Sequence, residues 1–244
     1  MTIKYQILYR ACDKIESVHK DKRPFGLNKL ETIKVAFYSL YQSLQGFSYQ
    51  FIIIGDDLSK ELQDFFEQFD DVIVDNCKLG SAAKSLQKQI DIALKVPDNV
   101  WVYMSEDDYL HSENMMEEMI ISYERIATQF NRDIFMCPTD YPYLYMNNEK
   151  TNILIGNKRH WRTVSKSLCT FMTTKPLLDK YWNNFYSTCL DRNDPFEKYL
   201  NEIYKKEFCI SPLKSLSLHL TNVNSSYGLS PFIDYKKLWE ENKY

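Results

Sequence analysis

The sequence lacks any long hydrophobic run. No window approaches the roughly 18 uncharged apolar residues of a membrane-spanning helix. The first ten residues, Met-Thr-Ile-Lys-Tyr-Gln-Ile-Leu-Tyr-Arg, also lack the apolar segment of a secretion signal. We therefore expect a cytoplasmic protein without a transmembrane segment, and peripheral contact with a membrane stays open.

An excess of basic residues is absent as well. The 244 residues include 30 Lys and Arg against 33 Asp and Glu, which gives a formal net charge of -3. Binding to nucleic acid without sequence preference requires a basic face that neutralises phosphates, so the charge argues against this function and leaves only a local basic patch open. The six cysteines show no CxxC spacing, which argues against a zinc site and favours reduced packing residues.

The chain also has no internal repeat and no Gly- or Ser-rich linker that would separate two domains. A chain of this length can bury one large core. We therefore expect a single α/β domain over residues 1–244.

Apolar runs alternate with helical periodicity in the first half of the chain. Strands are expected at 5–9, 51–54, 72–74 and 100–104, and helices at 30–44, 62–69, 86–94 and 115–130. Unbroken apolar strands between helices are typical of a mostly parallel central sheet with helices on both faces. In such sheets, ligands bind at the carboxyl ends of the strands.

Several helix starts can be located from capping residues. Asn28 with Glu31 three residues later forms a capping pair, and Ser59, Ser81 and Ser112 can cap the following helices. After about residue 133 the alternation becomes irregular, with strands expected at 134–137, 153–155 and 167–173. We expect this second half to extend the same sheet and to build an acceptor site.

Acidic residues follow two of the predicted strands. Asp56 and Asp57 end one of them, and Glu106, Asp107 and Asp108 end another. Adjacent carboxylates repel one another unless they are solvated, paired with cations or bound to a metal. Oxygen ligands suit Mg2+ or Mn2+. The alternative is an acidic turn that stabilises the next helix start.

The order of these motifs resembles the GT-A nucleotide-sugar glycosyltransferases, particularly their family 2-like members. Phe-Ile-Ile-Ile-Gly-Asp-Asp-Leu-Ser is similar to the segment that reads Asp-Asp-Gly-Ser in the family, with Leu58 in place of the usual Gly. Glu106-Asp107-Asp108 occupies the place of the family's Asp-x-Asp-type motif. The resemblance covers roughly residues 3 to 125. It implies that residues 1–125 form the nucleotide-sugar-binding half and that residues 126–244 form the acceptor-binding half with a C-terminal tail.

The resemblance implies a role for individual residues. Asp108 would bind the metal, and His219, on the polar face of the alternating segment Leu216-Ser217-Leu218-His219-Leu220-Thr221, matches a late histidine that some members add. The implied nucleotide-binding residues are Arg10, Asp56, Asp57, Lys84, Glu106 and Asp107. For Arg10, Lys84 and the Asp56–Asp57 pair, a solvated strand end or helix face is the alternative, and for His219 a structural role.

The acceptor side is implied in the same way. Asp194, in Arg192-Asn193-Asp194-Pro195-Phe196-Glu197, matches the acidic residue that removes the acceptor proton in inverting members, and the same residues also make a good helix start. Tyr143, His160 and Trp161 are the expected acceptor-binding residues, because aromatic rings stack on sugars. Core packing is the alternative for these rings.

These observations predict a metal-dependent, inverting glycosyltransferase. It would use Mn2+ or Mg2+ to transfer a sugar from an NDP-sugar, UDP-linked in our interpretation, to a glycan, a lipid-linked molecule or another hydroxyl acceptor. One alternative is a sugar nucleotidyltransferase, but its Gly-rich phosphate loop is not seen, since residues 11–29 contain only Gly26. The other is a GT-A-like module that binds carbohydrate or a partner without turnover.

Overall fold

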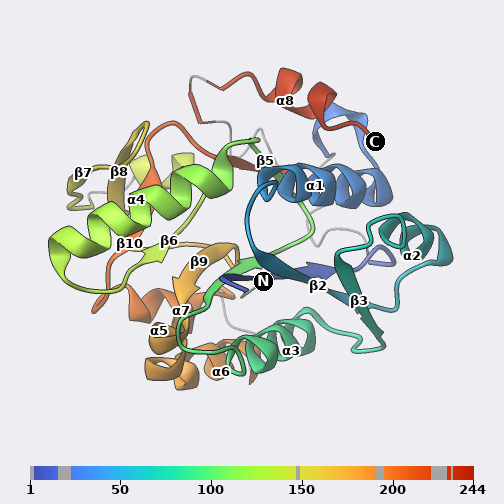
Figure 1. Cartoon of the computed structure of the whole chain (residues 1–244), viewed down its shortest axis with the longest axis horizontal. Coiled ribbons are helices and arrows are strands. Elements are labelled where there is room, and N and C mark those ends of the chain that lie inside the picture. The colour runs from blue at the N-terminus through green and yellow to red at the C-terminus, as the bar shows by residue number, and fades with distance from the viewer. Residues whose placement is uncertain (1–2, 16–22, 147–148, 191–194, 221–229, 232) are drawn as a thin grey trace.

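A nine-stranded sheet forms the centre of the molecule, with the strand order β3-β2-β1-β4-β9-β6-β10-β8-β7 (Figure 1). The computed structural model describes residues 3–15, 23–146, 149–190, 195–220, 230–231 and 233–244. Strands from both halves of the chain belong to this sheet, because β4 pairs with β9. The second half therefore extends the sheet that the first half begins.

The first four strands are parallel neighbours, as the apolar runs predict. They are β1 (Tyr5–Ala11), β2 (Tyr49–Asp56), β3 (Val72–Cys77) and β4 (Trp101–Ser105). The helices α1 (Lys29–Ser43), α2 (Lys60–Phe66) and α3 (Ala82–Ala93) connect them. Each strand is two or more residues longer than its apolar run, except β4, because pairing continues into the polar ends.

The second part of the sheet is mixed. It contains β6 (Phe135–Met136), β7 (Ile153–Ile155), β8 (His160–Val164), β9 (Phe171–Thr174) and β10 (Cys209–Pro212). β9 runs antiparallel to β4 and β6, and β8 runs antiparallel to β7 and β10, whereas β6 and β10 are parallel. The expected strand at 167–173 is thus confined to its end, and β8 and β10 were not predicted.

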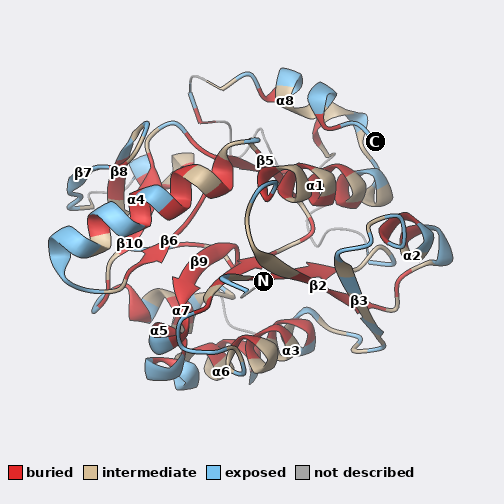
Figure 2. Cartoon of the chain, viewed as in Figure 1, coloured by how far each residue is buried: buried red, intermediate tan, exposed pale blue. Residues whose placement is uncertain are grey.

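Helices cover both faces of the sheet, which leaves the central strands buried (Figure 2). One face packs against α1, α2 and α4 (Met115–Phe130). The other packs against α3, α5 (Lys175–Lys180), α6 (Trp182–Leu190) and α7 (Lys198–Ile203). Short 3-10 turns lie at Pro24–Gly26 and Pro142–Tyr145. The predicted α/β fold class is therefore confirmed.

A second, two-stranded sheet lies beside α1 and pairs β5 (Tyr109–His111) with β11 (Ser217–His219) in antiparallel register. A small apolar cluster that includes Val35, Leu110 and Leu218 holds it against α1 and α8 (Tyr235–Glu241). The register places His219 opposite Tyr109. This sheet brings β11, from the last part of the chain, next to the acidic segment that follows β4.

Capping explains where several helices begin. The Asn28 side chain accepts a hydrogen bond from the backbone N–H of Glu31, and the Glu31 side chain accepts one from the N–H of Asn28, as the sequence predicts. Ser59 and Ser81 cap α2 and α3. Ser112 does not cap α4; this prediction is wrong by two residues because β5 continues to His111 and the helix starts after Asn114.

The order of the parallel strands changes direction between β1 and β4. From β1 the chain proceeds outward to β2 and β3, and then returns to the other side of β1 as β4. The carboxyl ends of β1 and β4 therefore lie side by side where the strand order reverses, which is the region where open α/β sheets bind ligands. We call this region the crevice. Among the described helices, none is long and apolar enough to cross a bilayer.

Candidate functional site at the carboxyl ends of β1 and β4

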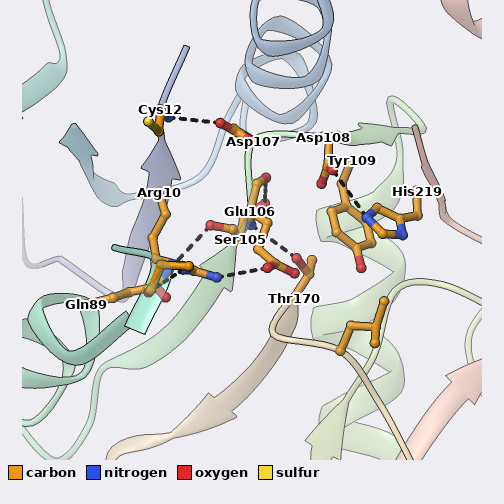
Figure 3. A network of polar contacts seen from close by, with 12 residues as sticks. Arg10, Cys12, Gln89, Ser105, Glu106, Asp107, Asp108, Tyr109, Thr170 and His219 are labelled. Atoms are coloured by element: carbon orange, nitrogen blue, oxygen red, sulfur yellow. Dashed lines mark hydrogen bonds and ion pairs between the residues drawn. The ribbon is translucent and has the colours of Figure 1, made fainter. Parts of the chain in front are cut away.

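The three acidic residues after β4 occupy this crevice, and their side chains point in three directions (Figure 3). Glu106 points toward β1, Asp107 toward the loop after β1, and Asp108 toward the small sheet. Each carboxylate has a different basic partner, Arg10, Lys29 or His219, from a different part of the chain. The mutual repulsion expected from their adjacency is relieved in this way.

Glu106 forms an ion pair with Arg10. The Nη2 atom of Arg10 lies 2.8 Å from Oε1 of Glu106, and Nη1 donates to the carbonyl of Ala82 at the start of α3. The backbone N–H of Glu106 donates to Oγ1 of Thr170. Burial raises the pKa of Glu106, and Arg10 opposes that rise. The predicted nucleotide ligands Arg10 and Glu106 thus face each other in the floor of the crevice.

Asp107 braces the chain segment after β1. One of its oxygens accepts the backbone N–H of Cys12 at 2.9 Å, and the other lies 2.7 Å from Nζ of Lys29. Both charged side chains are largely buried. Burial lowers the pKa of Lys29, but Asp107 and Asp108 together raise it by more, so the net shift is upward. These bonds give Asp107 a structural role, whatever it contributes to nucleotide binding.

Lys29 is a site residue that the sequence did not reveal. It is the first residue of α1, directly after the cap Asn28. A lysine in the first turn of a helix opposes the helix dipole, so its presence there is locally unfavourable. That unfavourable position is the signal that could have indicated a partner outside the helix.

Asp108 approaches His219 across the small sheet. Its Oδ2 atom lies 3.3 Å from Nε2 of His219, and its carbonyl accepts the N–H of Leu220. The His219 ring stacks on Tyr109 with a centroid separation of 4.6 Å and an interplanar angle of 15°. Burial lowers the pKa of His219, whereas the carboxylates of Asp108, Glu106 and Glu197 together raise it, and the net shift is upward. The two predicted metal ligands are therefore brought together.

The Asp108–His219 pair fits a divalent cation. In an octahedral site with bonds of about 2.1 Å, neighbouring ligand atoms lie roughly 3 Å apart, close to the observed 3.3 Å. Within the described ranges, no group of three or more His, Cys, Asp and Glu side chains could hold a metal. An ion held by this pair would have to take its remaining ligands from a bound ligand and water.

Asp56 and Asp57 differ sharply in their surroundings. The Asp56 carboxylate accepts the backbone N–H groups of Leu79 and Gly80, so it fixes the turn between β3 and α3. Asp57 adopts a left-handed backbone conformation with a φ of 55° and is partly exposed. Lys14, 2.5 Å away, holds the pKa of Asp57 below its ordinary value. Of the two, Asp57 is the one whose carboxylate lies at the surface.

The other predicted binding residues are spread more widely. Lys84 lies exposed on the first turn of α3. Tyr143 is partly buried and packs on Tyr141, whose hydroxyl lies 2.6 Å from that of Tyr109. Tyr143 is thus connected to the His219 side of the crevice. His160 is exposed on the outer hairpin, where it pairs with Ile155.

Trp161 does not line an acceptor site. It is fully buried, and its Nε1 atom donates to Ser122 at 3.0 Å and Glu118 at 3.3 Å. Its ring fills the space beside Gly156, where even a Cβ would come within 2.3 Å of it. The prediction of an acceptor role for Trp161 is therefore wrong, and core packing is the correct interpretation.

The candidate base Asp194 lies outside the described residues, so its role stays a prediction. Glu197, three residues later, is described and precedes α7. Burial is the main cause that raises the pKa of Glu197 to about 7, and the nearby Glu106 adds to the rise. The predicted cap joins Asp194 to Glu197, and its first residue lies outside the described residues. As the residue that precedes α7, Glu197 makes no side-chain cap hydrogen bond to this helix.

His111 serves the core and not the site. Its Nε2 atom lies 2.7 Å from the Tyr103 hydroxyl, and its backbone N–H donates to Ser39. Burial lowers the pKa of His111 to about 3, so the ring is neutral at physiological pH.

Comparisons with known proteins identify the fold. No protein-family model matches the chain, and no curated protein matches it significantly. The crystal structure of 4-diphosphocytidyl-2C-methyl-D-erythritol synthase is similar with a TM-score of 0.50 and 11% identity, over 93% of this chain and 96% of that one. S. aureus TarS 1-349 is similar with a TM-score of 0.52 and 10% identity, over 88% of this chain and 59% of that one.

A third solved structure, the 2-C-methyl-D-erythritol 4-phosphate cytidylyltransferase of Francisella tularensis, has a TM-score of 0.47 and 13% identity over 99% of both chains. The chain has a GT-A-like fold of the kind found in nucleotide-sugar-related transferases, which confirms the predicted resemblance at the level of fold.

Proposed function

We propose that this protein is a metal-dependent glycosyltransferase that transfers a sugar, with inversion, from an NDP-sugar, UDP-linked in our proposal, to a hydroxyl acceptor. The observation that carries the proposal is the Asp108–His219 pair. Oδ2 of Asp108 and Nε2 of His219 lie 3.3 Å apart near the strand ends where the strand order reverses. A cation held there would lie at the strand ends where nucleotides bind in related sheets. The fold alone does not determine this function, and the pair supplies the argument from the site.

The residues around the pair suit a nucleoside diphosphate. Asp108 and His219 would hold Mn2+ or Mg2+, which supplies Lewis acidity that stabilises the departing diphosphate. Lys29 and Arg10 add positive charge next to the acidic segment, although each is shared with a carboxylate. The partly exposed Asp57, at the end of β2, can accept hydrogen bonds from a base or ribose.

A nucleotidyltransferase is the second candidate, and the names of the structural neighbours favour it over glycosyl transfer. Those named above include a diphosphocytidyl-methylerythritol synthase and a cytidylyltransferase, against the glycosyltransferase TarS. The loop after β1 argues the other way, since residues 11–29 contain a single glycine. A phosphate-cradling loop normally requires several.

Nucleotide binding is the first test. The melting temperature would be measured with UDP, CDP, GDP and dTDP, each with Mn2+ or with EDTA. A ligand at 100 times its Kd stabilises by roughly 2.7 kcal/mol, so a shift of several degrees is expected for the cognate nucleotide with Mn2+. The absence of a shift for all four would contradict both transferase functions. The remaining alternative would be a module that binds carbohydrate or a partner without turnover.

Turnover then separates the two candidates. Release of UDP from UDP-glucose or UDP-N-acetylglucosamine in the presence of Mn2+ and sugar alcohols would support glycosyl transfer. Release of pyrophosphate from CTP with 2-C-methyl-D-erythritol 4-phosphate would instead support nucleotidyl transfer. Asp108→Asn should abolish whichever activity is found. Asp64→Asn is a matched control, because Asp64 is an exposed residue of α2 that forms an ion pair with the neighbouring Lys60.

A further inference from the structure

The edge of the central sheet at β7 presents two exposed isoleucines. β7 is the last strand in the order of the nine-stranded sheet and lies at the outer side of the molecule (Figure 1). Ile153 is 56% exposed and Ile155 is 57% exposed, although both belong to a paired strand. Tyr145, which is 55% exposed, stacks on the guanidinium of Arg162, the cross-strand partner of Ile153. An exposed apolar surface therefore adjoins the free edge of a strand.

The backbone of β7 directs hydrogen-bonding groups of both isoleucines toward this free edge. In an antiparallel pair, residues that bond to the neighbouring strand alternate with residues whose N–H and C=O groups point away from it. The carbonyl of Asn152 accepts a hydrogen bond from β8, and the N–H of Gly156 donates one to the turn that precedes β8. Leu154, midway between them, therefore also bonds toward β8. Ile153 and Ile155 consequently point their N–H and C=O groups outward.

The side chains of β7 divide between the two faces of the sheet. Leu154 lies opposite Trp161, whose ring nitrogen bonds to side chains of α4, and it packs against the main core. Ile153 and Ile155 point to the other face, because successive side chains alternate along a strand. The edge thus combines outward backbone groups with an exposed pair of large apolar side chains.

The two edges of the sheet differ in charge. β3 is the strand at the opposite edge, and its Asp75 carboxylate lies 2.7 Å from Nζ of Lys88. Charges of this kind are a common protection against pairing with another chain. β7 consists of Ile153, Leu154 and Ile155, all of them uncharged. This composition is typical of an edge that pairs with another strand.

The edge of β7 is complementary to itself. Antiparallel pairing of two copies about a two-fold axis through Leu154 places Ile153 of one copy opposite Ile155 of the other. Each of these two pairs can exchange two backbone hydrogen bonds, since both residues point their N–H and C=O groups outward. The four isoleucines then lie together on one face, which is the self-matching contact that a symmetric dimer requires.

Charges at the two ends of β7 fit the same pairing. The segment before β7 contains Glu149 and Lys150. The turn after β7 contains Lys158, which forms an ion pair with Glu117 of α4. The two-fold axis brings the first end of one copy beside the second end of the other, so each end meets charges of the opposite sign. A partner with charges of a single sign would not be matched in this way.

We propose that β7 is the interface of a homodimer, in which two copies join their central sheets by antiparallel pairing of residues 153–155. The pairing removes the exposed isoleucines from water and satisfies the outward N–H and C=O groups. Four strands separate β7 from β4 in the sheet order, so the crevice stays open in the dimer. The inference therefore does not depend on the function proposed above.

The first test is the mass of the full chain in solution. Sedimentation velocity would cover concentrations up to about 100 µM, because a small interface gives a weak dimer. The wild type should approach twice the chain mass of 29.1 kDa. Ile155→Lys should remain a single chain, because it places a charge at the pairing edge. Ile73→Lys is the matched control: Ile73 is 48% exposed on β3, at the opposite edge, and its variant should dimerise like the wild type.

A cysteine on the two-fold axis tests the register. In the proposed pairing, residue 154 lies opposite its own copy with Cα atoms about 4.5 Å apart, which is within the range of a disulfide. Leu154→Cys should therefore form a disulfide-linked dimer under mild oxidation. The wild type, with its six native cysteines, and Ile73→Cys should not.

Melting temperatures measured at a concentration where the wild type is monomeric show whether each variant keeps the fold. Ile155→Lys should also keep the Mn2+-dependent nucleotide shift of the wild type. The inference is overturned if the wild type stays a monomer at the highest concentration, if Ile155→Lys still dimerises, or if Ile73→Lys loses the dimer as well. Failure of a folded Leu154→Cys to cross-link would also overturn it. A wild type that dimerises but binds no nucleotide would contradict only the proposed function.

Discussion

Arg10 and Glu106 meet across the boundary between β1 and β4, with Nη2 and Oε1 2.8 Å apart. The parallel register pairs Tyr9 of β1 with Ser105 of β4, so the next residues, Arg10 and Glu106, lie together at the crevice. The second bond of Arg10, to the carbonyl of Ala82, joins α3 to the same point. Strand register, helix position and charge pairing are therefore fixed together at the point where the strand order reverses.

Removing one member of this ion pair should destabilise the fold. Arg10→Met leaves Glu106 without its cation, and a broken buried pair costs about 3–5 kcal/mol. Because the Glu106 side chain is 28% exposed, we expect a smaller loss of about 2 kcal/mol in the free energy of unfolding. Urea denaturation at pH 7 measures it. Glu61→Gln, which breaks the more exposed Lys34–Glu61 pair, is the control and should change the value by less than about 0.5 kcal/mol.

The metal assignment predicts that Asp108→Asn and His219→Ala both abolish the Mn2+-dependent shift in melting temperature caused by the nucleotide. Asn keeps the shape of Asp108 but loses the negative charge that binds a hard cation. His219→Ala should also weaken binding of Mn2+ alone, measured by isothermal titration calorimetry. If the nucleotide shift in Asp108→Asn still required Mn2+, then Asp108 would not be a ligand.

Local signals in the sequence predicted much of the fold. The capping box of Asn28 and Glu31 formed as expected, because its hydrogen bonds join residues three apart. The four parallel strands were located from apolar runs, since burial on both faces demands such runs. β5 and β10 were missed, because short strands do not create a pattern that differs from a loop.

The site could be predicted only where its residues lie at strand ends. Asp108 and His219 were expected to share a metal, and the structure brings them together through β5 and β11. The pairing of Asp107 with Lys29 joins residues 78 positions apart, and no local pattern encodes that distance. Trp161 was misassigned because an aromatic residue in an irregular segment gives no sign of its burial, which depends on Gly156 and α4.

Buried His111 should make the protein sensitive to acid. Its pKa is lowered to about 3 in the fold, below the ordinary value near 6.5. The stability it contributes is therefore present above pH 6.5 and is lost as the pH falls from 6.5 toward 3. His111→Gln removes this titration.

We expect the unfolding free energy of His111→Gln, relative to that of the wild type, to rise by on the order of 2–3 kcal/mol from pH 7 to pH 4. Urea denaturation at both pH values gives the two differences. The exposed His160 is the control site, and His160→Gln should show no such change. An equal difference at both pH values would mean that His111 titrates normally in the fold.

Glu197 should show the opposite dependence on pH, because its pKa is raised to about 7 in the fold, above its ordinary value near 4.3. The folded state then holds a proton that the unfolded chain releases, so the wild type loses stability as the pH rises from 4.3 through 7. Glu197→Gln, which stays neutral, should gain about 1–3 kcal/mol over the wild type on going from pH 5 to pH 8, since each pKa unit is worth roughly 1.4 kcal/mol. Urea denaturation of both proteins at the two pH values measures the gain. Glu202→Gln is the control, because Glu202 is an exposed residue of the adjoining helix α7 that forms an ion pair with Lys205. A constant difference would show that Glu197 is solvated and ionised in the fold at both pH values.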